Sequence, residues 1–164
     1  MLPDDYIRAV ADAVQAAGGI FVLDCVASGA MWVDMQALGV DVLLSAPQKG
    51  WSGPSCAGLV MLSENAASVL EKTSSSSFTI DLKKWVAVMA AYEQGGHMYH
   101  ATMPTDAITV FRDVQNETAA YGFERVKTEQ QQLGDAVRAA HGGEAVRDEQ
   151  HREAAAVDER VQCL

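Results

Sequence analysis

Two stretches of this chain decide its fold: Ile20-Phe21-Val22-Leu23-Asp24, and Val40-Asp41-Val42-Leu43-Leu44-Ser45-Ala46-Pro47-Gln48-Lys49. Each begins as a short, mostly apolar run, which is typical of a strand buried on both faces in the middle of a parallel sheet. We therefore predict strands over 20–24 and 40–44, with Asp24 ending the first and Lys49 in the loop after the second. Open α/β sheets bind ligands at the carboxyl edge of their strands, so this edge is the candidate site.

The segments around these strands alternate between helix and strand patterns. We predict a helix over 3–17, a helical turn at 34–38, a strand over 58–62 and a helix over 63–71. Helices beginning at Asp81 and Pro104 follow, and Gly122 separates the second of these from a further helix. The alternation indicates an α/β fold whose later helices lead toward another domain. Three large apolar side chains on these helices are predicted to lie in the core: Trp85, Met89 and Phe111.

Composition limits the class of protein. The 164 residues are 49% hydrophobic, which indicates a folded domain, and no run reaches the roughly 18 apolar residues of a membrane span. The net charge of −10 argues against binding to nucleic acid. The three cysteines form no CxxC pair and are odd in number, which favours a reducing, cytoplasmic setting. We expect neither nucleic acid nor a membrane as a partner.

The polar residues around Lys49 suggest a reactive amine. A lysine must lose its charge before it attacks a carbonyl group, and Ser45 and Gln48 are polar side chains at the mouth of a buried strand. Gly50 permits a tight backbone path beside a ligand. Asp24 places a carboxylate at the same edge, where a cationic partner is expected. The alternatives are a solvated loop lysine and an aspartate that only caps the following loop.

A third candidate segment, Tyr99-His100-Ala101-Thr102-Met103-Pro104, enters a helix. Hydroxyl groups and backbone amides at a helix N-terminus can hold a phosphate, but a plain turn with capping hydroxyls has the same pattern. His97 and His100 lack a second cluster of metal ligands, so the sequence does not favour a zinc site.

Three stretches together carry a resemblance to a known family. They are Val22-Leu23-Asp24-Cys25-Val26-Ala27-Ser28-Gly29, Gly39 through Lys49, and Tyr99 through Pro104. In order and spacing they resemble the class V aminotransferases of the fold-type I pyridoxal phosphate enzymes, particularly the serine–pyruvate and alanine–glyoxylate aminotransferase branch. The likeness runs from about residue 2 to 140. It implies an α/β fold in which a partial, mainly parallel sheet with flanking helices belongs to the large domain.

The resemblance gives each residue of the sheet edge a role. Lys49 would form the Schiff base with pyridoxal 5′-phosphate, and Asp24 would pair with the pyridine nitrogen. Val26 would press on the ring, while Ser45 and Gln48 would help to position the cofactor.

The resemblance also implies a homodimer with shared active sites. Tyr99 and Thr102 look like the pair that reaches the phosphate of the neighbouring subunit's cofactor. One departure from the family pattern is Pro47, which stands where a hydroxyl residue often precedes the Gln-Lys pair.

The implied activity is transfer of an amino group from an amino acid such as alanine or serine to an oxo acid such as glyoxylate or pyruvate. A first alternative is a non-catalytic remnant that binds the cofactor weakly or not at all. A second is a lyase of the same fold, similar to cysteine desulfurases, although those usually carry His where this chain has Gln48.

The likeness covers only part of the family's length. The upstream phosphate loop and the downstream small domain have no counterpart, so the chain looks like a fragment. We expect residues 1–140 to form a partial cofactor-binding large domain with the start of the connecting helix. Residues 141–164 are poor in large aliphatic side chains and read as an unmatched, disordered or out-of-frame tail.

Overall fold

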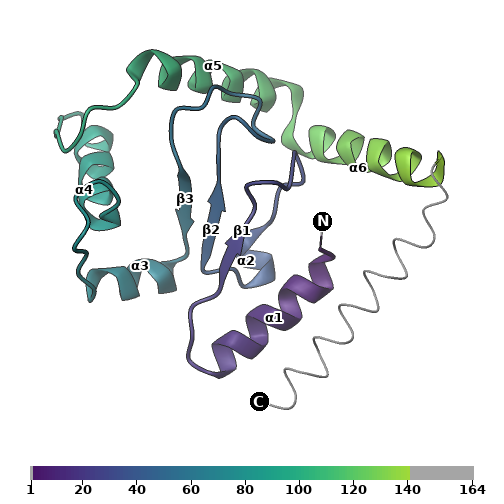
Figure 1. The fold of residues 1–164 in the computed structure, drawn as a ribbon, viewed down its shortest axis with the longest axis horizontal. Helices are drawn as coiled ribbons and strands as arrows, with labels where there is room; N and C mark the ends of the chain where they lie inside the picture. Colours follow the sequence, from purple (N-terminus) through teal and green to yellow (C-terminus); the bar gives the residue numbers. More distant parts are fainter. Residues whose placement is uncertain (1, 141–164) are drawn as a thin grey trace.

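A three-stranded sheet with helices around it forms the structure (Figure 1), a computed structural model that describes residues 2–140. In chain order the elements are α1 (Asp4–Ala16), β1 (Val22–Asp24), α2 (Met35–Leu38), β2 (Val42–Ser45), β3 (Leu59–Leu62), α3 (Glu64–Glu71), α4 (Leu82–Glu93), α5 (Thr105–Tyr121) and α6 (Phe123–Ala140). The α/β class is confirmed. The predicted tail at 141–164 lies outside the described residues.

The order of the strands in the sheet is β1-β2-β3. β1 and β2 are parallel, with Asp24 paired to Leu44, so their carboxyl ends lie at the same edge. β3 runs antiparallel to β2. The prediction of a mainly parallel sheet therefore holds for the first pair only, because the chain returns from β2 to β3 through a loop without the helical crossover that parallel neighbours require.

One face of the sheet is covered by α1 and α2. Ile7 of α1 and Leu38 of α2 pack with Cys25, Val40 and Leu43 in one apolar cluster. On β1, in contrast, Val22 is 50% exposed. The prediction that this strand is buried on both faces is wrong for the described residues, because β1 lies at the edge of the sheet there and its outer face lacks a covering element.

A buried carboxylate joins the start of the sheet to α3. Asp41 is 3% exposed and accepts hydrogen bonds from the Phe21 amide (3.0 Å), the Ser63 hydroxyl (3.0 Å) and the Asn65 side-chain amide (2.9 Å). Burial raises the pKa of Asp41, but the hydrogen bonds from Phe21, Asn65 and Ser63 outweigh it and leave the pKa below its usual value. The sequence pattern had placed this residue inside an apolar strand without a role.

The helix boundaries follow local capping. Ser63 and Asp81 each accept a hydrogen bond from a backbone amide in the first turn of α3 and α4. Phe111 is buried as predicted, whereas Met89 on α4 is 61% exposed. The prediction for Met89 is wrong because α4 packs mainly against α3 and lies beside the sheet rather than on it (Figure 1). Within residues 2–140, no helix has both the length and the apolar character to cross a membrane.

Candidate functional site

The first part of the site is the end of β1. Asp24 is exposed, and its Oδ1 accepts a hydrogen bond from the amide of Val26 at 2.9 Å. The Cys25 amide donates to the carbonyl of Leu44 at 2.8 Å, which continues the parallel ladder one residue past the strand. Asp24 therefore caps the loop that follows it, which was one of the two roles that the sequence left open. It also presents a carboxylate at the carboxyl edge of the sheet.

The second part is the loop that follows β2. Ser45 and Pro47 are buried, whereas Gln48 and Lys49 are exposed. The Lys49 amide donates to the Ala46 carbonyl (3.2 Å), and the Lys49 carbonyl accepts from the Ser52 amide (3.1 Å). Lys49 is thus the shared residue of two consecutive turns, so its backbone is fixed while its side chain is free to reach a ligand.

The two loops meet where two glycines face each other. A Cβ atom added to Gly50 would lie 1.8 Å from the carbonyl oxygen of Gly29, a distance at which no side chain fits. We predicted that Gly50 allows close approach to a ligand, but in the structure its backbone approaches the loop after Asp24 instead. This contact places the Asp24 and Lys49 loops side by side at one edge of the sheet.

An aromatic cluster, which the sequence analysis missed, holds these loops against α5 and α6. Trp32 and Trp51 have ring centroids 4.6 Å apart, and the Trp51 ring meets Phe111 of α5 edge-on at 6.3 Å. Phe123 of α6 packs edge-on against Trp32 at 5.8 Å, and its carbonyl accepts the Trp32 indole N–H at 3.1 Å. The signal available in the sequence was a tryptophan in each loop, since loops rarely expose such large apolar surface.

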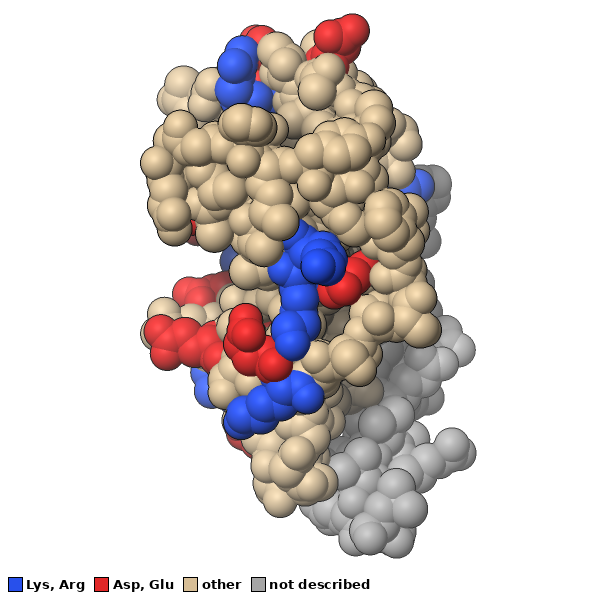
Figure 2. All heavy atoms as spheres, turned by 90° about the vertical axis from the view of Figure 1, so that its left-hand side faces the viewer, with Lys and Arg blue, Asp and Glu red and all other residues tan. Residues whose placement is uncertain are grey.

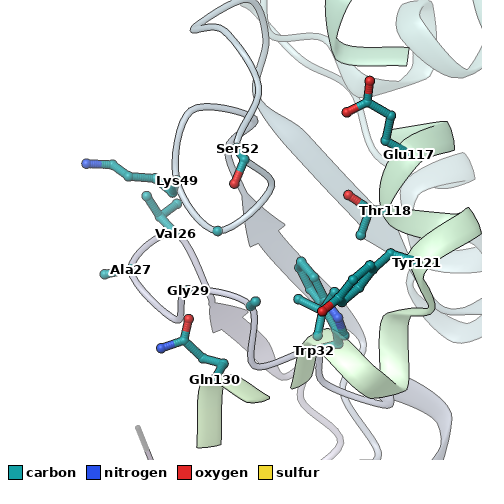
Figure 3. Close-up of a pocket in the computed structure, with 13 residues that line it drawn as sticks. Val26, Ala27, Gly29, Trp32, Lys49, Ser52, Glu117, Thr118, Tyr121 and Gln130 are labelled. Carbon is teal, nitrogen blue, oxygen red and sulfur yellow. The ribbon is translucent and has the colours of Figure 1, made fainter. Parts of the chain in front are cut away.

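A cavity of about 820 Å³ lies between the two loops and the helices α5 and α6. Figure 3 shows Glu117, Thr118 and Tyr121 along the α5 side and Gln130 on α6, with Trp32 deeper in. Lys49 lines the rim, but its side chain extends away from Tyr121 and the α5 wall in this view. The amine is therefore directed toward the open side of the loops rather than into the cavity.

The α5–α6 corner of the cavity wall is held by polar contacts. The Tyr121 hydroxyl donates to the Glu129 carboxylate (2.8 Å to Oε2), and the Arg125 guanidinium lies 4.2 Å over the Tyr121 ring while its Nε donates to Glu129 at 2.9 Å. The hydrogen bond to Glu129 raises the pKa of the Tyr121 hydroxyl, and the hydrogen bond from Arg125 lowers the pKa of Glu129. Both directions are those expected when a protonated phenol and a charged guanidinium pair with an ionised carboxylate.

The third predicted segment lies elsewhere. Tyr99 is 75% exposed and its hydroxyl bonds to that of Thr102 at 3.0 Å, while Nε2 of His100 bonds to the Phe78 carbonyl at 2.7 Å. The α4–α5 loop that carries them lies on the left in Figure 1, away from the loops after β1 and β2. In the part of the chain that the structure describes, no group of three or more potential metal ligands comes together.

The structure thus brings to one edge of the sheet the two loop regions that carry five of the seven predicted cofactor-binding residues, namely Asp24, Val26, Ser45, Gln48 and Lys49. Of these five, Val26 and Lys49 line the cavity, and the segment with Tyr99 and Thr102 lies apart from them. Comparison with known families matches residues 5–142 to aminotransferase class V. The chain belongs to the class V aminotransferase family.

Solved structures agree with this class V aminotransferase fold. The chain is similar to the alanine–glyoxylate aminotransferase from Nostoc sp., with a TM-score of 0.66, 22% sequence identity and 77% of this chain covered. It is also similar to an aspartate aminotransferase of subgroup IV from Thermus thermophilus, with a TM-score of 0.63, 24% identity and 84% coverage. No curated protein sequence matches it.

The class V aminotransferase chain is short beside these structures. It spans 33% of the Nostoc protein and 38% of the Thermus protein. The resemblance to the family and to its fold is confirmed.

Proposed function

We propose that this chain carries the lysine-bearing part of the large domain of an aminotransferase that uses pyridoxal 5′-phosphate. The observation that carries the proposal is the contact of two loops, at Gly29 and Gly50, which brings an amine and a carboxylate to one edge of the sheet. The parallel pairing of Asp24 with Leu44 puts both loops at the carboxyl ends of neighbouring strands. That edge is where open α/β sheets bind ligands.

The chemistry of these side chains fits the cofactor. A pyridoxal ring offers an aldehyde for an amine and a basic nitrogen for a carboxylate, and the exposed Lys49 and Asp24 supply these two partners. Val26 is a half-buried aliphatic residue beside Asp24 that can cover a ring, and Ser45 supplies a hydroxyl at the end of β2. Gln48 adds an exposed amide next to the amine.

Each of these residues would have a separate role in the reaction. When bound, the cofactor supplies an electron sink for the substrate's Cα carbanion. Lys49 would hold the cofactor through its amine, and the same amine, once free, would take the proton from the substrate Cα. Asp24 keeps a proton on the ring nitrogen, and Ser45 and Gln48 orient the ring by hydrogen bonds. The substrates would be an amino acid such as alanine or serine and an oxo acid such as glyoxylate or pyruvate.

The distance of Tyr99 and Thr102 from Lys49 supports a homodimer in which they serve the partner's site. The side of the molecule formed by α4 and the loops before and after it exposes large apolar side chains: Phe78, Ile80, Met89, Tyr92, Met98 and Tyr99. Figure 2 shows this side, where a broad uncharged area lies between a few charged residues at the top and a band of charged residues below. Uncharged surface of this kind is typical of an interface between subunits.

One observation favours the alternative of a non-catalytic remnant. Lys49 and Asp24 are both exposed, and Lys49 extends away from the cavity wall formed by α5 (Figure 3). A site this open holds a small ligand weakly, because little of the ligand surface is buried. On this alternative the isolated chain attaches the cofactor but does not turn over substrate.

Trapping of the cofactor on the 164-residue chain tests the proposal. The chain is mixed with pyridoxal 5′-phosphate and reduced with borohydride, and the labelled lysine is located by peptide mass spectrometry. We expect the label at Lys49 and its loss in Lys49→Ala. Lys84→Ala removes another exposed lysine, on α4, and is the matched control that should label like the wild type.

The results of trapping and of an activity assay distinguish the aminotransferase, the non-catalytic remnant and the lyase. Label spread evenly over the surface lysines would overturn the assignment of Lys49. Label at Lys49 without conversion of alanine to pyruvate would support the remnant, and conversion that requires Lys49 would support the aminotransferase. An amino-group balance distinguishes transfer from a lyase similar to cysteine desulfurases, which would break the C–S bond of cysteine and leave the amino group on the alanine product instead of passing it to an oxo acid.

A further inference from the structure

We propose that Trp51 is a positioning residue for Lys49, acting through a hydrogen bond to Ser45; this inference rests on the proposed function of Lys49. The indole N–H of Trp51 donates to the Ser45 Oγ at 3.0 Å. Ser45 is the last residue of β2 and is 8% exposed. The bond therefore ties the far side of the loop to the rigid end of a strand and closes the loop around Lys49.

The backbone of the loop over residues 47–53 has little conformational freedom. The Pro47 side chain is fully buried, and its carbonyl accepts from the Gly53 amide at 2.9 Å. Ser52 adopts a φ of 57°, in the left-handed region that non-glycine residues seldom occupy. Surrounding contacts must hold Ser52 in this conformation. Its amide donates to the Lys49 carbonyl at 3.1 Å, and the residue before it, Trp51, is tied to Ser45.

The indole ring is itself anchored from outside the loop. It packs against Trp32 from the loop after β1 and meets Phe111 of α5 edge-on. Phe123 at the start of α6 also lies edge-on to it, with the ring centroids 6.4 Å apart. Contacts with three other segments, the loop after β1, α5 and α6, thus fix the Trp51 ring. Its backbone lies only two residues after Lys49.

The position from which the Lys49 side chain extends depends on this anchoring, because its exposed amine has no hydrogen bond or ion pair among residues 2–140 that would hold it. The same hydrogen bond orients Ser45. One lone pair of its Oγ accepts the indole N–H, so the hydroxyl proton is free to be donated at the sheet edge. Trp51 therefore sets the geometry of two residues of the cofactor site without touching the ligand.

Conservative variants of the 164-residue chain test this role. Trp51→Phe keeps an aromatic ring but removes the N–H, Ser45→Ala removes the acceptor, and the double variant completes a cycle. Trp85→Phe is the matched control, since its indole N–H bonds to the Thr79 carbonyl outside the site. The measurements are borohydride-trapped pyridoxal 5′-phosphate at Lys49 under limiting cofactor, relative to Lys127 in the same sample, and amide hydrogen exchange over residues 46–53.

We expect Trp51→Phe to lower the labelling of Lys49 about fivefold, the equivalent of one hydrogen bond, and to raise exchange in residues 46–53. Ser45→Ala should have a similar effect, and the double variant should add little to either. Trp85→Phe should change neither. Unchanged exchange in Trp51→Phe, which is measured without cofactor, would overturn the proposal, as would faster exchange with unchanged labelling of Lys49. Equal labelling of Lys49 and Lys127 in the wild type would instead count against the proposed function, and exchange alone would then decide whether Trp51 fixes the loop.

Discussion

The backbone of Gly50 lies against the carbonyl oxygen of Gly29, with space for a hydrogen atom but not for a methyl group. This relationship joins the loop that follows Asp24 to the loop that holds Lys49. Backbone packing therefore sets how far apart the loops that carry the Asp24 carboxylate and the Lys49 amine lie. Side-chain contacts between the two groups are not needed.

Replacing Gly50 by alanine should therefore force the two loops apart. We expect Gly50→Ala to lower the free energy of unfolding by about 1–3 kcal/mol, as overpacking does, and to reduce trapping of the cofactor at Lys49. Gly58→Ala is the matched control, because a Cβ added there meets no atom within 4 Å. Urea titration of both variants measures the difference, and equal stabilities would show that the loop contact is not tight.

The charge of Asp24 can be separated from its role in the loop. Asp24→Asn keeps an oxygen that accepts from the Val26 amide, whereas Asp24→Ala loses both the charge and this hydrogen bond. A hydrogen bond to a charged group contributes about 1.5–3 kcal/mol, so we expect Asp24→Asn to weaken cofactor binding by about tenfold to a hundredfold. Its urea midpoint should stay close to that of the wild type, while that of Asp24→Ala falls. Normal cofactor affinity in Asp24→Asn would leave Asp24 with the loop role alone.

Asp41 should make the stability of the fold sensitive to acid. Its pKa is lower in the folded state than the value of 3.8 expected without contacts. Its contribution is therefore fully present above that value and is lost as the pH falls toward the folded pKa. Asp41→Asn should cost about 1–3 kcal/mol at neutral pH and remove part of the acid dependence. Urea midpoints between pH 7 and about 3 measure this, with the exposed Asp12→Asn as control; parallel pH profiles for the two variants would contradict it.

The two described cysteines should differ in reactivity. Burial is the main reason why the pKa of Cys25 is raised; the hydrogen bond with Ser28 opposes this, and the nearby Asp24 charge adds to it. Because the thiolate is the reacting form, Cys25 should be alkylated more slowly than the half-buried Cys56, and its rate should rise only at higher pH. Peptide mass spectrometry after timed iodoacetamide treatment gives both rates in one sample. Faster alkylation of Cys25 near neutral pH would contradict the prediction.

Local sequence signals predicted most of the elements. Ser63 and Asp81 mark the predicted starts of two helices, and each caps its helix in the structure, because a capping side chain acts within three residues of itself. Gly122 ends α5 with a φ of 105°, which other residues seldom adopt. The roles proposed for Lys49 and Asp24 came from their positions after two apolar runs together with the family resemblance.

The sequence by itself therefore determined the helices, the strands and the edge of the sheet at which the polar residues gather, because these depend on neighbours along the chain. The tertiary structure alone decided that β3 runs antiparallel, that Met89 is exposed and that Asp41 accepts three hydrogen bonds. It also decided that Gly50 packs on Gly29 and Trp51 on Trp32. These features are contacts between segments distant in sequence, and their geometry exists only once the loops and helices have packed around the sheet.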